Sequence, residues 1–362
     1  MIRVNQILKS RKSSRVPTRF SYGLFSSKRS FDMPFSWLFA MIAGAFILFI
    51  AIYAATKFTS TGGQIASSES AKMIANLLNP AVSGIASSYT LAPLKFNKET
   101  RIHFSCEEKT SNSPIFGRQI IAFSEQSGFL SKWSAPGLNI SRYNKYVFAD
   151  NVEQGKTFYI LVRPFYTGFK VDDLIMMSSK DYCFIAPPEN IREEIDMMGA
   201  KNINSSNTIK ECKKGSVSVC FNSENSFSAG ECNVTISGEC SESWCSNVYE
   251  MGTVVKNGIT LNYAGNLMYA AIFSSPKIYN CNMVRLGNKI DQLSTLYSEK
   301  ITIMKMRDCT SNTESDLLQI NEASKIIKTS AEIVNIYSFG KVMDETACNE
   351  KICSVYEPET CI

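Results

Sequence analysis

MPFSWLFAMIAGAFILFIAIYAAT, residues 33–56, contains no charged side chain and sets the architecture of the chain. As an α-helix with a rise of about 1.5 Å per residue it would be roughly 36 Å long, which exceeds the ~30 Å hydrocarbon core of a bilayer. Trp37 lies near one end and Tyr53 near the other, as in the aromatic belts of membrane helices. The sequence therefore predicts one transmembrane helix over residues 33–58.

Basic residues are concentrated before this helix. Residues 1–32 hold eight Lys and Arg residues and one acidic residue, so that segment carries +7 and the remainder of the chain −2. Because Lys and Arg are retained on the cytoplasmic side, we expect a disordered cytoplasmic tail at 1–32 and an outer domain after the helix. A nucleic-acid-binding domain would carry its basic excess in the folded part, so we expect no nucleic-acid partner.

Cleavage is the alternative to a retained anchor. Secretory apolar regions run to about 7–15 residues, and cleavage after Ala55 would place Tyr53 where a small side chain is needed. A second alternative is a pilin-like filament subunit that is processed near Ser30 and packs its helix into a filament core. The N-terminus of the mature protein distinguishes an anchor from such a subunit.

All twelve cysteines follow the apolar helix. An even number confined to one side of a membrane span indicates disulfide bonds in an oxidising compartment. The chain has no C-x-x-C pair and one histidine, His103, so we expect neither a metal nor a cofactor. The disulfide candidates are Cys106, Cys183, Cys212, Cys220, Cys232, Cys240, Cys245, Cys281, Cys309, Cys348, Cys353 and Cys361.

Three acceptor sequons for N-glycosylation also lie after the helix, at Asn139-Ile140-Ser141, Asn204-Ser205-Ser206 and Asn233-Val234-Thr235. They are compatible with an exported domain, although triplets of this kind also occur by chance.

Residues 59–98 read as a linker with a stalk. The apolar spacing between Ile65 and Leu78 predicts an amphipathic helix that Asn79-Pro80 ends.

From residue 99 the pattern changes to short runs rich in β-branched and aromatic residues, which predict a mostly antiparallel β outer domain over 99–273. The predicted strands are residues 101–106, 118–123, 145–150, 157–165, 172–179 and 182–186.

Three local signals stand out within this domain. Pro187-Pro188 predicts a helix at Glu189–Met198 that Gly199 ends. Residues 201–248 form a polar, Cys-rich segment with few large aliphatic residues, which we interpret as an insert that relies on disulfides. Asn257-Gly258 predicts a hairpin with a type I′ turn.

The last hundred residues are helical in pattern. Ser275-Pro276 predicts a capped helix start, and apolar residues at helical spacing form two stripes separated by a polar break near Cys309. We expect a long antiparallel helical hairpin over 274–348, followed by a Cys-containing tail at 349–362. Such a hairpin would place Cys281 opposite Cys348, so we predict that pair. The fold class is therefore α+β.

Three segments, the anchor and about a third of the outer part, carry a resemblance to a group of proteins: MPFSWLFAMIAGAFILFIAIYAATKF, MSSKDYCFIAPPENIREEI and LMYAAIFSSPKIYNCNMVRLGNKIDQLSTLYSEK. Together they resemble an uncharacterised group of archaeal single-pass membrane proteins with a disulfide-containing outer domain. The resemblance implies topology and no activity.

No catalytic constellation emerges from the sequence. His103 lies in a predicted strand and reads as a sheet-face histidine. Asp172 and Asp173 are adjacent on a strand and should point to opposite faces, which makes them a poor acid–base pair. Glu193 and Glu194 read as the solvated face of a helix. We expect no catalytic residues.

The membrane helix carries a stripe of small residues, Ala40, Gly44, Ala51 and Ala55. Small residues at this spacing let helix backbones approach closely, so we predict a homo-oligomer through this face in the lipid bilayer. The sequence as a whole favours a single-pass cell-surface protein that binds an unknown surface partner or is structural. A pilin-like subunit and a surface hydrolase are the alternatives.

Overall fold

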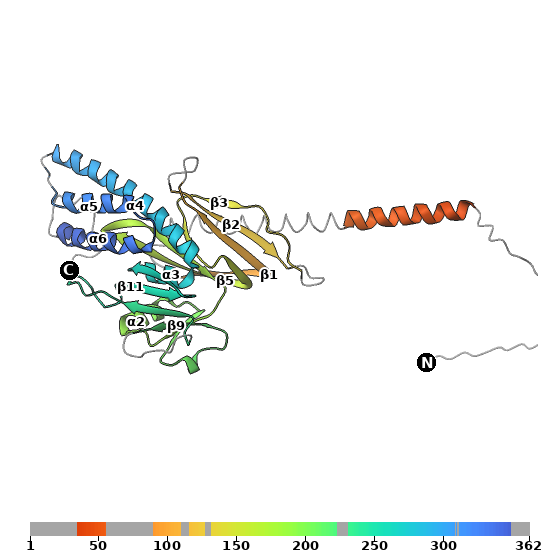
Figure 1. Ribbon diagram of the computed structural model, residues 1–362, viewed down its shortest axis with the longest axis horizontal. Helices are drawn as coiled ribbons and strands as arrows, with labels where there is room; N and C mark the ends of the chain where they lie inside the picture. Colours follow the sequence, from red (N-terminus) through yellow and green to blue (C-terminus); the bar gives the residue numbers. More distant parts are fainter. Residues whose placement is uncertain are drawn as a thin grey trace, which may run out of the picture. The chain divides into compact units, whose positions relative to one another are not determined.

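The computed structural model describes residues 35–55, 90–109, 116–126, 132–222, 231–307, 309 and 311–348. The chain divides into two compact units, Met1–Lys57 and Phe58–Ile362. The first contains the helix Phe35–Ala55, which is long and apolar enough to cross a membrane (Figure 1).

Three predicted segments lie outside the described residues: the tail at 1–32, the stalk helix at Ile65–Leu78 and the C-terminal tail at 349–362.

The second unit is a mixed α+β domain with two six-stranded sheets (Figure 1). The first sheet has the order β3-β2-β1-β5-β6-β4, and all its neighbours are antiparallel except β6 and β4. Its strands are β1 (Thr90–Glu107), β2 (Arg118–Glu125), β3 (Ile140–Arg142), β4 (Tyr146–Phe148), β5 (Val152–Thr167) and β6 (Phe169–Ser178).

The second sheet has the order β12-β11-β10-β9-β7-β8. Its strands are β7 (Tyr182–Ile185), β8 (Ile203–Ser206), β9 (Val217–Phe221), β10 (Val234–Gly238), β11 (Met251–Lys256) and β12 (Ile259–Ala264). The pairs β7–β8, β7–β9 and β9–β10 are parallel, so the prediction of a mostly antiparallel domain is wrong for this sheet. Parallel neighbours need a crossover, and α2 (Glu189–Met198) provides it between β7 and β8.

Residues 201–248 are not an insert, and that prediction is corrected. They supply β8, β9 and β10, which are half of the second sheet. Val219, Phe221, Val234 and Ile236 are fully buried there. A strand needs an apolar side chain only at alternate positions, so a largely polar segment can still contribute to the core.

Local turn and cap signals are confirmed. Helix α2 ends at Gly199, which has a φ of 57°. The turn between β11 and β12 has positive φ at both Asn257 and Gly258, as a type I′ turn requires. The side chain of Ser275 accepts a hydrogen bond from the backbone of Ile278 at the start of α4.

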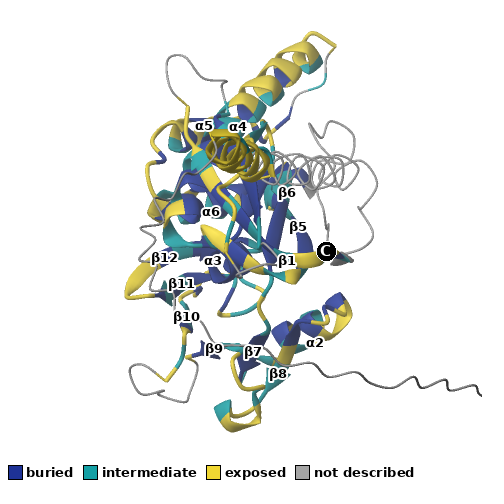
Figure 2. Cartoon of the chain, turned by 90° about the vertical axis from the view of Figure 1, so that its right-hand side faces the viewer, coloured by how far each residue is buried: buried dark blue, intermediate teal, exposed yellow. Residues whose placement is uncertain are grey.

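The main core lies between the sheets. Tyr182 and Phe184 of β7 belong to it, whereas Cys183 and Ile185 between and beyond them pack on the opposite face. The short helix α3 (Leu267–Phe273) contacts strands of both sheets, and all seven of its residues are buried. Figure 2 shows buried residues along the strands of both sheets.

Three helices follow α3 and lie together at one end of the domain (Figure 1). They are α4 (Pro276–Lys305), α5 (Glu314–Lys325) and α6 (Ile333–Cys348). The predicted two-helix hairpin is therefore not found, because its second arm is divided. Thr329 and Glu332 form a capping box that starts a new helical segment at η3 (Ser330–Glu332), which leads into α6.

Four disulfides link cysteines on the described part of the chain: Cys106–Cys281, Cys183–Cys212, Cys220–Cys232 and Cys240–Cys245. Cys309 is also disulfide-bonded. The predicted pair Cys281–Cys348 is wrong, because the first turns of α4 pack on β1 and bring the Cα of Cys281 within 6.1 Å of that of Cys106. The side chain of Cys348 and residues Cys353 and Cys361 lie outside the described residues.

Candidate ligand-binding site

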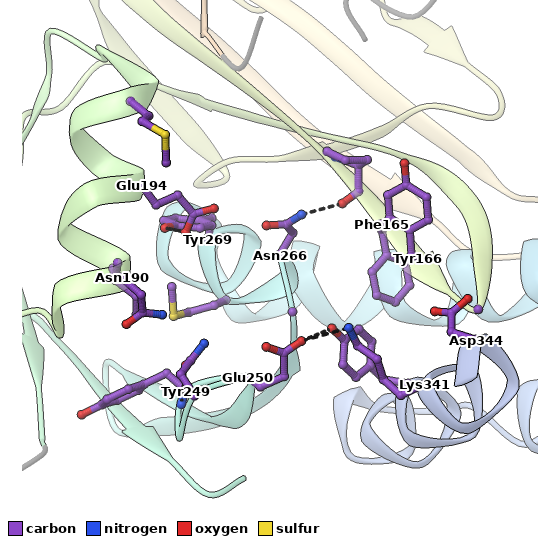
Figure 3. Close-up of a pocket in the computed structure, with 18 residues that line it drawn as sticks. Phe165, Tyr166, Asn190, Glu194, Tyr249, Glu250, Asn266, Tyr269, Lys341 and Asp344 are labelled. Atoms are coloured by element: carbon purple, nitrogen blue, oxygen red, sulfur yellow. Dashed lines mark hydrogen bonds and ion pairs between the residues drawn. The ribbon is translucent and has the colours of Figure 1, made fainter. Parts of the chain in front are cut away.

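A cavity of about 430 Å³ opens on the second unit, and its walls come from five separate parts of the chain (Figure 3). They are the end of β5, α2, the loop before β11, the turn between β12 and α3, and α6. Two clusters around the carboxylates of Glu194 and Glu250 dominate its polar lining.

The first cluster is centred on Glu194 of α2. Its carboxylate forms an ion pair with Arg163 of β5 and accepts a 2.5 Å hydrogen bond from the hydroxyl of Tyr269. The Nε of Arg163 also donates to Oδ1 of Asn266 at 3.1 Å, and Nδ2 of Asn266 donates to the carbonyl of Pro164 at 2.8 Å. These bonds tie α2, β5 and the start of α3 together. Each polar side chain of this cluster is therefore already orientated by a hydrogen bond or an ion pair to a neighbour.

The phenol of Tyr269 stays protonated. Burial raises its pKa well above the ordinary value, and the Arg163 charge opposes that shift only in part. Tyr269 therefore acts as a hydrogen-bond donor to Glu194 over the whole physiological pH range.

The second cluster is centred on Glu250, the residue immediately before β11. Its Oε2 accepts from the hydroxyl of Ser246 at 2.6 Å, and its Oε1 accepts from the hydroxyl of Tyr337. The Nζ of Lys341 lies 3.4 Å from the same Oε1. Burial acts to raise the pKa of Glu250, but the hydrogen bonds from Ser246 and Tyr337 and the Lys341 charge outweigh it. The net pKa is lowered, so Glu250 is ionised.

Two glycines allow α6 to reach this position. A Cβ at Gly340 would lie 2.4 Å from the carbonyl carbon of Thr167, so the helix backbone rests directly on the β5–β6 turn. Gly265 has a φ of 52°, and a Cβ there would lie 3.0 Å from the hydroxyl of Tyr337. Close approach at both positions brings Tyr337 and Lys341 of α6 to the cavity.

The charges of the two clusters are compensated in pairs, and a third carboxylate, that of Asp344 on α6, also lines the cavity. Glu194 is neutralised by Arg163, and Glu250 by Lys341. The side chain of Asn190 on α2 is exposed at the cavity and makes no hydrogen bond within the described part of the chain. Apart from the carboxylate of Asp344, the lining thus offers neutral donors and acceptors, and each charged member of the two clusters has a partner of opposite charge.

The interpretation of Glu193 and Glu194 as one solvated helix face is wrong for Glu194. Glu193 is exposed, but its neighbour is directed to the cavity and held by Arg163 and Tyr269, as Figure 3 shows for the labelled pair Glu194 and Tyr269. One residue along a helix turns a side chain by about 100°, which separates the two glutamates.

The two aspartates of β6 are engaged elsewhere. Asp172 lies 3.5 Å from the Nζ of Lys289, and Asp173 lies 2.7 Å from the Nζ of Lys170. Burial raises the pKa of Asp172, while the backbone N–H of Asp173 and the charge of Lys289 act against it. Neither aspartate lines the cavity.

The one histidine of the chain forms a contact away from the cavity. The Nε2 of His103 on β1 lies 2.6 Å from the Oγ of Ser124 on β2. Burial, followed by the charge of Arg101, lowers the pKa of His103, so it is neutral at pH 7. Ser124 is only 1% exposed and could not meet a substrate. This pair is a contact of the sheet face.

Sequence reasoning missed Arg163, Glu250, Tyr337 and Lys341. One signal was present for Arg163, since a charged residue interrupts the apolar run TFYILVRPF at residues 157–165. A buried arginine requires a partner, which points to an ion pair without saying where that partner lies. The other three residues stand in no local motif.

The stripe of small residues on the apolar helix and the question of a metal site remain. Ala40, Gly44, Ala51 and Ala55 are all exposed on the apolar helix Phe35–Ala55, and among the described residues a Cβ at Gly44 would meet nothing within 4 Å. Among the described residues, no three His, Cys, Asp or Glu side chains gather as a metal site.

No family model, curated protein or solved structure matches this chain.

Proposed function

We propose that this protein is a single-pass membrane protein, with its N-terminus inside and its C-terminal domain outside, whose outer domain binds a small uncharged polar ligand. The apolar helix Phe35–Ala55 and the disulfide-bonded domain are compatible with that topology. The +7 charge of residues 1–32 supports the orientation, because basic segments stay in the cytoplasm.

Charge compensation at the cavity is the observation that carries the ligand class. Glu194 and Glu250 already have Arg163 and Lys341 as partners, so a charged ligand would have to break an ion pair to pair with either cluster. A neutral ligand rich in hydroxyl groups can instead hydrogen-bond to the unused lone pairs of the carboxylates and to the amides, while an apolar face packs on Tyr166, the half-buried tyrosine of the lining. A saccharide has this chemistry.

Binding is tested on the full-length protein in detergent by calorimetry against a panel of neutral mono- and disaccharides. Asn190→Ala removes a carboxamide from the cavity without breaking an internal bond. We expect it to weaken binding by about tenfold, which corresponds to one lost hydrogen bond of roughly 1.4 kcal/mol.

Glu193→Ala is the matched control. It is exposed on the same helix and does not line the cavity, so its affinity should equal that of the wild type. Equal weakening by both variants, or tighter binding of amino or acidic sugars than of neutral ones, would overturn the proposed ligand class.

Orientation is tested separately. Protease added to intact cells should digest the domain and spare the tail at 1–32. A protected domain would contradict the proposed topology whatever the cavity binds.

A further inference from the structure

The three sequons of the domain differ in how their reacting groups are engaged. Transfer of a glycan needs two groups of the acceptor, namely the carboxamide of the Asn and the hydroxyl two residues later. Each group must be free to leave its surroundings and enter the active site of a transferase. In the folded domain, the carboxamide and the hydroxyl of each sequon make different numbers of hydrogen bonds, which must break before the sequon can enter a transferase.

Asn233 is held through its own carboxamide. Its Oδ1 accepts from both the backbone N–H and the hydroxyl of Ser218, each at 2.9 Å, and its backbone N–H donates back to the Ser218 hydroxyl at 3.0 Å. The neighbouring Cys232 is fixed to Cys220 by a disulfide. Releasing this carboxamide would break two hydrogen bonds next to a covalent crosslink.

Asn204 is held through the hydroxyl of its triplet. The hydroxyl of Ser206 donates to the carbonyl of Thr208 at 3.0 Å, contacts the carboxylate of Glu211, and accepts from the N–H of Thr208 at 3.2 Å. The Asn204 side chain is exposed, but its residue is paired with Cys183 within the β7–β8 ladder. The sequon is therefore accessible at one of its two groups.

Asn139 is free at both groups. Within the described part of the chain, neither its carboxamide nor the hydroxyl of Ser141 makes a hydrogen bond. Asn139 is exposed and lies just before β3, which is an edge strand of the first sheet. The adjacent Leu138 is exposed as well, at 76%.

The segment that carries Asn139 is nevertheless anchored. The N–H of Gly137 donates to the carbonyl of Phe123 at 2.8 Å, and the N–H of Ser134 donates to the carbonyl of Glu125 at 3.0 Å. Asn139 is thus presented at the edge of an ordered sheet with its side chain in solvent.

We propose that Asn139 is the principal N-glycosylation site of this protein, and that Asn233 is not modified on the folded domain. This inference rests on the proposed outward orientation. The co-substrate is a glycan linked through diphosphate to an isoprenoid lipid. The Nδ2 of Asn139 forms a bond to the anomeric carbon, the bond from that carbon to the diphosphate oxygen breaks, and the diphosphate leaves with the electron pair. The Nδ2 proton passes to a base of the transferase.

The three sequons fall on three separate tryptic peptides, 133–142, 202–210 and 215–256, so their occupancy can be measured independently. The full-length protein is purified from its native membranes, reduced, alkylated, digested and analysed by glycopeptide mass spectrometry. We expect the highest glycan occupancy on the peptide with Asn139 and an unmodified peptide with Asn233. An unmodified Asn139, or equal or higher occupancy at Asn204 or Asn233, overturns the inference.

Variants of the sequon show whether loss of the glycan comes from loss of the acceptor groups or from misfolding of the domain. Asn139→Gln and Ser141→Ala should each abolish the glycan on peptide 133–142, whereas Ser141→Thr should retain it. Retention of the same glycan mass on that peptide in Ser141→Ala contradicts the inference. The protease assay on intact cells distinguishes the two causes of an unmodified Asn139. If protease digests the domain, the outward orientation holds and the site inference is wrong. If the domain is protected, the proposed orientation is wrong.

Discussion

The hydroxyl of Tyr337 donates a hydrogen bond to the carboxylate of Glu250 across 87 residues of sequence, and this bond joins α6 to the loop before β11. Trp244, on the loop closed by Cys240–Cys245, packs edge-on against Tyr337 with ring centroids 6.1 Å apart. One wall of the cavity is therefore held by a charged hydrogen bond, an aromatic contact and a disulfide.

Tyr337→Phe should destabilise the domain by about 1.5–3 kcal/mol, because it removes a hydrogen bond to an ionised and largely buried acceptor. The measurement is the free energy of unfolding in urea, on the full-length protein in detergent. Tyr159→Phe is the control, since Tyr159 is half-buried and its hydroxyl makes no hydrogen bond within the described residues. It should change stability by less than about 0.5 kcal/mol. Similar losses in both variants would show that the Tyr337–Glu250 bond contributes nothing specific.

Glu250→Gln should change how stability depends on pH. The pKa of Glu250 in the folded domain is below its ordinary value of 4.5. Its ionised form therefore contributes stability that is fully present above pH 4.5 and is lost as the pH falls through the folded-state pKa. The wild type should lose stability in that acid window, and the variant should lose less of it. The measurement is the unfolding midpoint from pH 7 to pH 3, and parallel curves for the two proteins would contradict the prediction.

Two disulfides should differ in their contributions to stability. Cys106–Cys281 closes a sequence separation of 175 residues and Cys240–Cys245 one of 5. Loop-closure entropy gives an upper estimate of about 5 kcal/mol for the first and about 2 kcal/mol for the second. The Cys106→Ser/Cys281→Ser double variant should therefore lose more stability than Cys240→Ser/Cys245→Ser. Thermal unfolding without reductant measures the difference, and the reverse order would refute the prediction.

A buried lysine links the two sheets and should be intolerant of replacement. The Nζ of Lys256 lies 3.0 Å from Oδ1 of Asp150 and donates to the carbonyls of Ile272 and Ser274 at 3.1 and 3.0 Å. Burial lowers the pKa of Lys256, and the Asp150 charge only partly restores it. Lys256→Met should cost about 1–3 kcal/mol, because the carbonyls of Ile272 and Ser274 lose a buried donor, although Asp150 keeps its ion pair with Lys180.

Lys213→Met is the matched control for Lys256→Met. Lys213 forms an exposed ion pair with Asp181, so its loss should leave the urea midpoint unchanged. If both lysine variants shift the midpoint equally, burial is not the cause of the loss at Lys256.

Association through the membrane helix stays a prediction. Gly44→Ile would place a branched side chain in the stripe of Ala40, Gly44, Ala51 and Ala55 and block close approach, while insertion is unharmed because isoleucine suits the bilayer. Crosslinking in membranes should show an oligomer for the wild type and less of it for the variant. The same crosslinked species in both proteins would indicate that this stripe faces lipid and makes no helix–helix contact.

Much of the architecture follows from neighbours along the chain. The uncharged run at 33–56, the strands at 101–106 and 118–123, and the turn at Asn257-Gly258 are all specified by spacing or by conformational preference within a few residues. The restriction of the cysteines to one side of the apolar helix likewise indicated disulfides.

The pairing of distant parts was settled only by packing in three dimensions. Cys281 bonds to Cys106 because α4 lies against β1, a contact with no counterpart in local sequence. The cavity has the same origin, since Glu194, Arg163, Glu250 and Tyr337 come from four separate elements and meet only when both sheets enclose α3. Hydrophobic periodicity reports which face of an element is buried, but it carries no information on which partner covers that face. For that reason the elements could be read from the sequence, whereas the disulfide pairing and the candidate site required the tertiary structure.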